Sequence, residues 1–177
     1  MEKRKHKGLV GVVLFFSLLA FIAHGVAFGV PYWYRQSLSS VSAYGGLWQI
    51  CYEISGTATW YQITCQGLAT GDTLFTLMGV ITLIIKMCKG SKPVCKSGLV
   101  ASCFLFVIGG LMIAGATTVW ALYQTDIIKE NKSYAFWVDC GAGGLLILSA
   151  FLLVLPIYAP ETSVTPTTQQ NQNWTKS

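Results

Sequence analysis

The chain has 177 residues, of which 53% are hydrophobic and only 11% are charged, and its formal net charge is +5. Because about a quarter of the residues in soluble domains are charged, this composition excludes an ordinary soluble protein and predicts one embedded in membrane lipid. The positive charge is concentrated in two short segments, 3–7 and 86–96, beside apolar runs. That placement is typical of contact with anionic lipid and gives no reason to expect a nucleic-acid partner.

Four apolar runs predict four membrane-spanning helices, at residues 8–30, 67–87, 98–123 and 135–157. Each run reaches about the 20 residues that a helix needs to cross a bilayer. The second does so if the long side chain of Lys86 extends to the interface. An alternative interpretation makes the first run a cleaved signal peptide, because basic residues precede it and residues 25–27 resemble a cleavage site. Its uncharged length favours a membrane helix.

The basic residues also predict which side of the membrane each connection faces, because Lys and Arg accumulate in cytoplasmic loops. Four of them lie in residues 3–7 and four in residues 86–96. We therefore expect cytoplasmic segments at 1–7, 88–97 and 158–177, and extracellular segments at 31–66 and 124–134. The polar C-terminal tail is predicted to be disordered. This topology predicts a multi-pass plasma-membrane protein with both termini in the cytoplasm.

The long extracellular segment contains two cysteines, Cys51 and Cys65, on the oxidising side where disulfides persist. The stretches LWQICYEI and WYQITC around them are rich in aromatic and β-branched side chains, with turn residues around Gly56. This pattern predicts a β-hairpin with its tip near Ala58 that places Cys51 opposite Cys65. A disulfide there would stabilise the fold by about 3 kcal/mol in the chain-entropy model. The alternative is a pair of free thiols.

The other cysteines allow more than one interpretation. Cys88 and Cys95 flank the basic inner connection, where lipid acylation and an unmodified thiol are equally compatible with the sequence. Cys103 and Cys140 lie in apolar surroundings, and we expect them to be small packing residues.

Six residues form a motif that begins at the end of the first run and continues through the extracellular segment: Trp33, Gly46, Leu47, Trp48, Cys51 and Cys65. The motif resembles the W, GLW, C, C signature of the claudin superfamily, which also has four spans with a long first and a short second outside loop. The resemblance covers the chain up to about Tyr158. It implies a membrane all-α four-helix bundle with a small extracellular antiparallel β-sheet, in which Cys51 and Cys65 are bonded between neighbouring strands.

Two functions are compatible with this resemblance. The first is cell–cell adhesion and paracellular barrier formation at tight-junction-like contacts, with the sheet pairing to like molecules in cis and in trans. The second is an auxiliary or trafficking subunit that docks laterally on a channel, receptor or other membrane partner. We favour the first, because it is the dominant use of the superfamily. The chain ends in NWTKS, without the aromatic-valine terminus of claudins, so no PDZ scaffold is expected there.

Aromatic residues of the extracellular segment are expected to anchor the sheet to the bundle and to contact a partner. Trp33 and Trp48 should lie near the outer headgroups, where an indole buries its ring and still donates a hydrogen bond. They would hold the sheet to the bundle. Trp60 and Tyr61 fall near the predicted hairpin tip, so we expect them to contact a partner.

Polar residues suggest two further sites outside the membrane. Asn131 begins the acceptor sequence Asn-Lys-Ser on the extracellular side, which makes it a possible glycosylation site of a glycoprotein. Any charge-selective paracellular pore would depend on Glu53, with Asp72 a distant second.

Within the first run, Gly25 and Gly29 have a GxxxG spacing. It favours close packing inside the bundle, and the alternative is a lateral contact with another copy. His24 is expected to form hydrogen bonds across helices, because the sequence offers no second histidine in another span for a metal or proton site. Asp72 is expected to cap the second helix or to face a polar vestibule.

The sequence offers no sign of an enzyme. It has no nucleophile with a paired base, no cluster of metal ligands and no phosphate-binding loop. We therefore expect no catalytic site, no cofactor and no bound metal.

Overall fold

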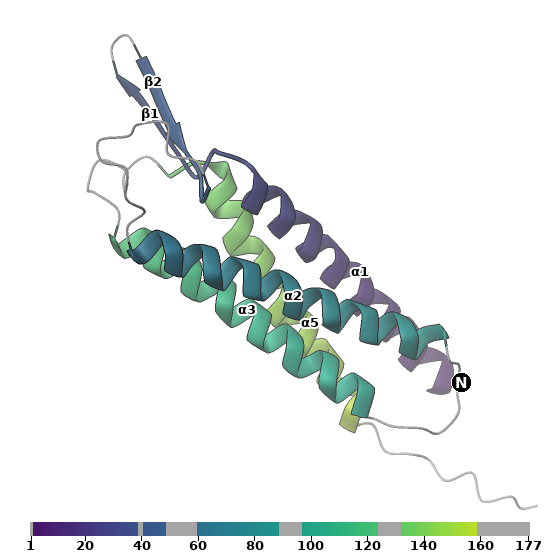
Figure 1. Cartoon of the computed structure of the whole chain (residues 1–177). Coiled ribbons are helices and arrows are strands. Elements are labelled where there is room, and N and C mark those ends of the chain that lie inside the picture. The colour runs from purple at the N-terminus through teal and green to yellow at the C-terminus, as the bar shows by residue number, and fades with distance from the viewer. Residues whose placement is uncertain (1, 39–40, 49–59, 89–96, 124–131, 159–177) are drawn as a thin grey trace, which may run out of the picture.

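The computed structural model describes residues 2–38, 41–48, 60–88, 97–123 and 132–158. In chain order these residues form α1 (Glu2–Gly29), β1 (Tyr34–Leu38), β2 (Val41–Gly45), α2 (Trp60–Cys88), α3 (Ser97–Tyr123) and α5 (Tyr134–Tyr158). The helices run up and down in a single bundle, and the hairpin β1–β2 stands at the end where α1 finishes and α2 begins (Figure 1). The start of α1 lies at the opposite end.

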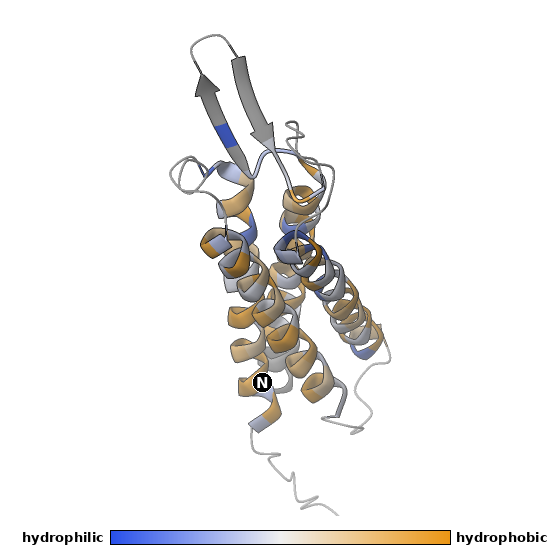
Figure 2. Ribbon diagram, turned by 60° about the vertical axis from the view of Figure 1, so that its left-hand side comes forward, coloured by the Kyte–Doolittle hydropathy of each residue, from blue (hydrophilic) through white to orange (hydrophobic). Residues whose placement is uncertain are grey.

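Each of the four helices is long and apolar enough to cross a membrane, with mean hydropathy between 1.8 and 2.4 in its most apolar window. Hydrophobic residues recur along all four helices, as the orange colour in Figure 2 shows. Phe15, Phe104 and Phe151, for example, are more than 60% exposed on three different helices. Large apolar side chains in such numbers on an outer surface are stable in lipid rather than in water. Among the described residues, the prediction of a bundle of four helices, each long and apolar enough to span a membrane, is therefore confirmed.

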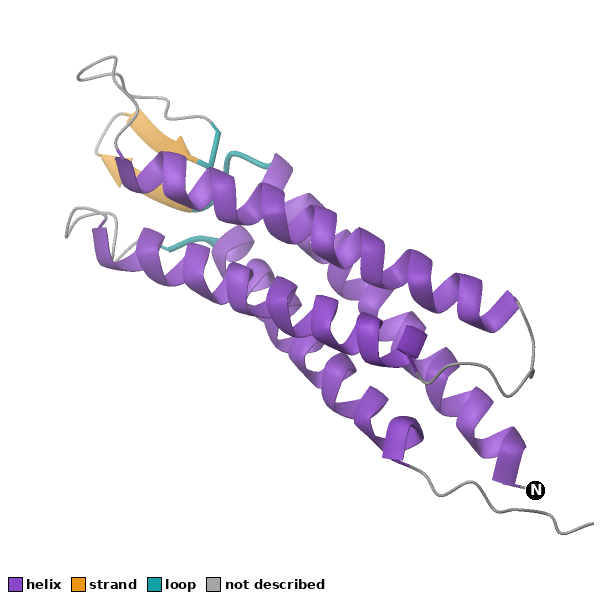
Figure 3. Cartoon of the chain, turned by 60° about the horizontal axis from the view of Figure 1, so that its bottom comes forward, coloured by secondary structure: helices purple, strands orange, loops and turns teal. Residues whose placement is uncertain are grey.

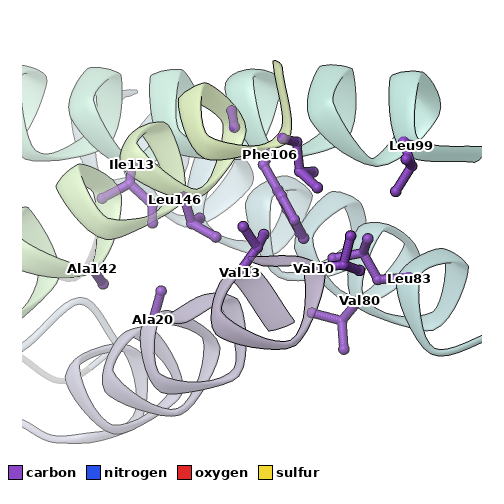
Figure 4. Close-up of a cluster of buried hydrophobic side chains, with 12 residues drawn as sticks. Val10, Val13, Ala20, Val80, Leu83, Leu99, Phe106, Ile113, Ala142 and Leu146 are labelled. Carbon is purple, nitrogen blue, oxygen red and sulfur yellow. The ribbon is translucent and has the colours of Figure 1, made fainter. Parts of the chain in front are cut away.

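The core follows the bundle axis and takes side chains from all four helices. Val13 of α1, Leu83 of α2, Phe106 of α3 and Leu146 of α5 are completely buried in one cluster. Figure 4 shows these side chains pointing into a common interior. Because lipid is as apolar as these residues, close packing rather than escape from water holds the helices together here.

Helix α2 begins at Trp60, seven residues before the predicted span 67–87, so the stretch WYQITC is helical and the prediction of a strand there is wrong. Its aromatic and β-branched residues suit either structure, and contacts with another helix decide the outcome. Cys65 is buried between α2 and α3, and Trp60 packs on Tyr123. The remainder of the predicted hairpin, with its tip near Ala58, lies outside the described residues.

A different hairpin is present upstream. Strands β1 and β2 pair antiparallel from Tyr34 opposite Gly45 to Leu38 opposite Val41. Figure 1 shows it projecting beyond the end of α1, and Figure 3 shows its two strands, in orange, from another side. At its base the Trp33 N–H donates to Gly45 O at 2.8 Å, and the Ser133 N–H donates to Trp33 O at 2.9 Å. The first bond closes the base of the hairpin, and the second ties it to the segment that leads into α5.

Candidate functional site

The motif residues that the structure describes meet at the base of the hairpin. Trp33 is completely buried, and its indole N–H donates to Ala27 O of α1 at 2.7 Å. Its ring lies 5.5 Å from that of Trp120 on α3 and 6.2 Å from that of Phe136 on α5, between ring centroids. Trp33 thus joins the hairpin to three helices, as its expected anchoring role requires.

At Gly46 and Leu47, directly after β2, the chain packs closely against the bundle. A Cβ atom at Gly46 would lie 2.6 Å from Pro31 Cα and 2.7 Å from Val30 O, so only glycine fits without a backbone shift. Leu47 is buried, and its carbonyl accepts a hydrogen bond from the Gln66 side chain of α2 at 3.0 Å. The backbone at these two positions is therefore fixed by both α1 and α2.

Trp48 has a more superficial position than Trp33. It is 50% exposed, and its ring meets that of Phe28 edge to face with 5.0 Å between centroids. An indole that is half covered by the end of α1 suits the interfacial role expected of it.

Cys65 lies inside the bundle rather than on an extracellular strand. Its thiol is free and buried, and Sγ donates to Ala116 O of α3 at 3.3 Å. Cys51 lies outside the described residues. The structure therefore gives no support to the Cys51–Cys65 disulfide, because one of its two thiols packs between α2 and α3.

Trp60 and Tyr61 occupy the first turn of α2, not a hairpin tip, which corrects their predicted position. Trp60 meets Tyr123 edge to face at 4.6 Å, and Tyr61 stacks on Tyr123 at 6.5 Å and 13°. Trp60 remains 59% exposed. These residues form an aromatic group at the start of α2 and the end of α3, at the same end of the bundle as the hairpin. Aromatic side chains are common at the ends of membrane helices.

Gly25 and Gly29 lie on an exposed face of α1, and a Cβ atom at either position would have no neighbour within 4 Å. Close packing of this GxxxG face inside the bundle was therefore the wrong interpretation. The alternative, a lateral contact, is still open. Glu53 and Asn131, predicted for a pore charge and a glycan, lie outside the described residues.

The polar centre of the bundle is formed by His24 of α1, Asp72, Thr73 and Thr76 of α2, and Asp139 of α5. His24, Asp72 and Asp139 are each at most 2% exposed. His24 Nδ1 lies 2.6 Å from Asp139 Oδ1, and His24 Nε2 lies 3.3 Å from Asp72 Oδ2. The imidazole thus stands between two carboxyl groups and joins three helices, which confirms the expectation that His24 bonds across helices.

The Nε2 side of His24 faces the backbone and side chains of α2. It lies 3.3 Å from Ala69 O and 3.2 Å from Thr73 Oγ1. The Thr73 hydroxyl donates its own proton to Ala69 O at 2.8 Å. Together with Asp72 Oδ2, three oxygen atoms of α2 therefore lie within 3.3 Å of this imidazole nitrogen.

Asp72 lies inside α2, well past its first turn, and it is buried. The prediction that it caps the helix or faces a polar vestibule is therefore wrong. Its Oδ1 accepts a hydrogen bond from the Thr76 hydroxyl at 2.9 Å. Helix α3 makes room for the carboxyl group with Gly109, where a Cβ atom would lie 2.6 Å from Asp72 Oδ1. A helix that starts at Trp60 leaves Asp72 no free N–H groups to cap, so it must find side-chain partners.

Two carboxyl oxygens of the polar centre have no hydrogen-bond partner among the described residues, Asp72 Oδ2 and Asp139 Oδ2. Buried oxygens without a partner are costly in a protein interior and mark a place where a proton, water or ion matters. Within the described part of the chain, no group of three His, Cys, Asp or Glu side chains is arranged to hold a metal ion. What the contacts of the polar centre do is join α1, α2 and α5.

Asp139 is the ionisable residue of this centre that the sequence analysis missed, together with the hydroxyl residues Thr73 and Thr76. It is the one carboxylate inside the predicted span 135–157, and His24 is the one ionisable group inside 8–30. Ionisable residues within membrane spans usually pair with each other. That rule, applied to all spans together, was the signal that could have joined Asp139 to His24 and Asp72.

Comparisons with known proteins give no family for this chain. No protein-family model matches it, and no curated protein sequence matches it. The resemblance to the claudin superfamily therefore rests on the motif residues and on the four-span architecture.

Proposed function

We propose that this is a claudin-like membrane protein that acts in cell–cell adhesion and forms a paracellular barrier. In this proposal the bundle spans the plasma membrane with both termini in the cytoplasm, as the basic segments favour. The hairpin β1–β2 then lies outside the cell. It pairs with hairpins of like molecules in the same membrane and in the opposing one.

The observation that carries the proposal is the hairpin that projects from the bundle. Within the described residues, β1 and β2 form a two-stranded sheet and pair only with each other. A hairpin of two strands is marginally stable alone, and the outer edge of each strand presents backbone N–H and C=O groups that can extend the sheet. Such an edge favours association by strand addition.

The base of the hairpin supports the same proposal, because adhesion needs a strand held firmly against pull and rotation. Trp33 is buried among aromatic rings of α3 and α5, and Gly46 is wedged against Pro31. The hairpin is therefore attached to the bundle at both of its ends. A rigid attachment lowers the entropy lost when two copies pair.

The proposal is tested by expression in epithelial cells that lack strand-forming relatives. We expect the protein to concentrate where two expressing cells touch and to lower transepithelial conductance. The variant Gln36→Pro removes a backbone N–H in β1 and weakens strand pairing, so it should reach the surface and spread evenly. Gln36→Ala is the matched control and should behave as the unmodified chain. Even distribution and unchanged conductance for surface-delivered unmodified protein would overturn the proposal.

A second candidate function, an auxiliary or trafficking subunit, is favoured by one specific observation. The Gly25/Gly29 face of α1 is open, and small residues on an open face let another helix approach closely. The partner would be a channel, receptor or other protein with a membrane helix.

Purification from the native membrane in mild detergent tests this candidate. Gly25→Leu with Gly29→Leu should abolish the recovery of a copurifying membrane protein. Gly141→Leu, at an exposed position of α5 that also has no neighbour within 4 Å, should leave it unchanged. Equal recovery with both variants would exclude docking through this face.

A further inference from the structure

The polar centre determines where the protons of His24 lie. Ala69 O can only accept a hydrogen bond, and Thr73 Oγ1 has given its proton to Ala69 O. For both to be partners of His24 Nε2, that nitrogen must carry a hydrogen. The geometry of α2 therefore selects the Nε2–H form of the imidazole.

The contact of the other nitrogen, Nδ1, with Asp139 then needs a second proton. His24 Nδ1 and Asp139 Oδ1 lie 2.6 Å apart, the distance of a strong, charge-assisted hydrogen bond. If Nδ1 had only its lone pair and Asp139 were ionised, two electron-rich atoms would face each other in a buried site. The contact requires one proton, whether it is bonded to Nδ1 or to Oδ1, and with that proton the pair has no net charge.

We propose that His24 and Asp139 form a binding site for one exchangeable proton, and that this proton latches α1 to α5. Release breaks one N–H or O–H bond and passes the proton to water or to a buffer base. The charge of the pair changes from zero to −1, and a carboxylate is left against an imidazole lone pair at a site where both side chains are at most 2% exposed. The contact between α1 and α5 then loses its hydrogen bond and becomes repulsive.

The groups around the latch make the loss of its proton hard to compensate. Helix α2 supplies Asp72, a further carboxyl group, on the Nε2 side of the same imidazole. Helix α3 contains no Lys, Arg, His, Asp or Glu. On α5 the neighbour of Asp139 is the Cys140 thiol, and Lys132 before that helix lies over the Phe136 ring, 5.0 Å from its centroid.

Nitrogen NMR on the full chain in lipid tests the proton directly. The chain has two histidines, so His6→Gln with ¹⁵N-labelled histidine leaves His24 as the one signal source. We expect Nε2 to be bonded to hydrogen, and Nδ1 to share a proton that it loses in a single step as the pH is raised. In Asp139→Asn the side-chain amide can still donate to Nδ1, so Nδ1 should be unprotonated throughout and show no step. An Nε2 without hydrogen, or a step that survives Asp139→Asn, would overturn the proposal.

Unfolding measurements on the same chain in detergent test the latch. Above about pH 6.5 an unfolded histidine and an unfolded aspartate hold no extra proton, so folding takes up one proton wherever the folded pair holds the proposed one. The folding equilibrium constant should therefore fall by about tenfold per pH unit, until the folded chain also releases its proton.

The variants separate the latch from its surroundings. Asp139→Asn should remove the pH dependence, and Asp72→Asn should retain it. A slope that is the same in Asp139→Asn as in the unmodified chain, or no slope in the unmodified chain, would contradict a bound proton. If Asp139→Asn fails to fold, the NMR spectrum of the His6→Gln chain still decides the question.

Discussion

Two regions of the molecule join helices by different means, and both include α1 and α5. At the base of the hairpin, the Trp33 side chain joins α1, α3 and α5 through aromatic contacts and a single hydrogen bond to Ala27. Deeper in the bundle, the polar centre joins α1, α2 and α5 through hydrogen bonds between ionisable groups. Dispersion contacts are many and individually weak, whereas the polar contacts are few and depend on one another.

This difference predicts how each region responds to damage. When an aromatic side chain is truncated, the fold loses stability in proportion to the atoms removed. A buried polar group that loses its partner keeps its full desolvation cost, so the loss is abrupt. The polar centre should therefore be the more fragile of the two regions, although it contains fewer atoms.

The largest expected effect is that of His24→Ala, which leaves both carboxyl groups without the imidazole. Removing one partner of a buried ionic pair typically costs about 3–5 kcal/mol, and we expect a loss of that size in the free energy of unfolding. Denaturant titration in micelles measures it. Ser17→Ala is the control on the same helix, because the Ser17 hydroxyl is buried and bonds only to Leu14 O in its own turn. Equal losses in both variants would mean that the polar centre does not hold the helices together.

An intermediate effect is expected at the base of the hairpin for Gly46→Ala. The new methyl group would collide with backbone atoms of Pro31 and Val30, and overpacking of this kind costs about 1–3 kcal/mol. We expect reduced surface delivery and faster proteolysis of the hairpin, with the helices retained. Gly29→Ala, where a methyl group meets nothing within 4 Å, should have no such effect. A Gly46→Ala chain as protease-resistant as Gly29→Ala would show that the base tolerates movement.

Most of the fold could be predicted from the sequence because membrane spans are decided locally. A run of apolar residues of the right length is sufficient, and the four helices lie where the four runs do. The start of α2 was missed because WYQITC has strand-forming residues. Its helical form depends on contacts with Tyr123 and Ala116, more than 50 residues away. Such long-range contacts leave no local pattern.

The polar centre could be predicted in part, for a similar reason. A histidine in an apolar run must find a partner, and that rule alone predicted cross-helix bonding for His24. The partner is 115 residues away, on a helix whose rotation about its own axis no pattern in the sequence determined. The spacing of Gly25 and Gly29 shows that one face of α1 carries small residues. It does not show whether that face turns toward the bundle or away from it. Which faces meet is decided by packing of the whole bundle.

The smallest expected effect is that of Thr76→Val, and it tests whether Asp72 belongs to the polar centre or merely lies beside it. Valine keeps nearly the shape of threonine but removes the hydroxyl that donates to Asp72 Oδ1, so we expect a loss of about 1 kcal/mol in the free energy of unfolding. Thr82→Val is the control, because the Thr82 hydroxyl is exposed and bonds to Met78 O of its own helix. The same Thr76 change in an Asp72→Ala chain should cost nearly nothing, since the acceptor is gone. A cost that is unchanged in that background would show that Thr76 acts through packing, and the polar centre would then reduce to the His24–Asp139 pair.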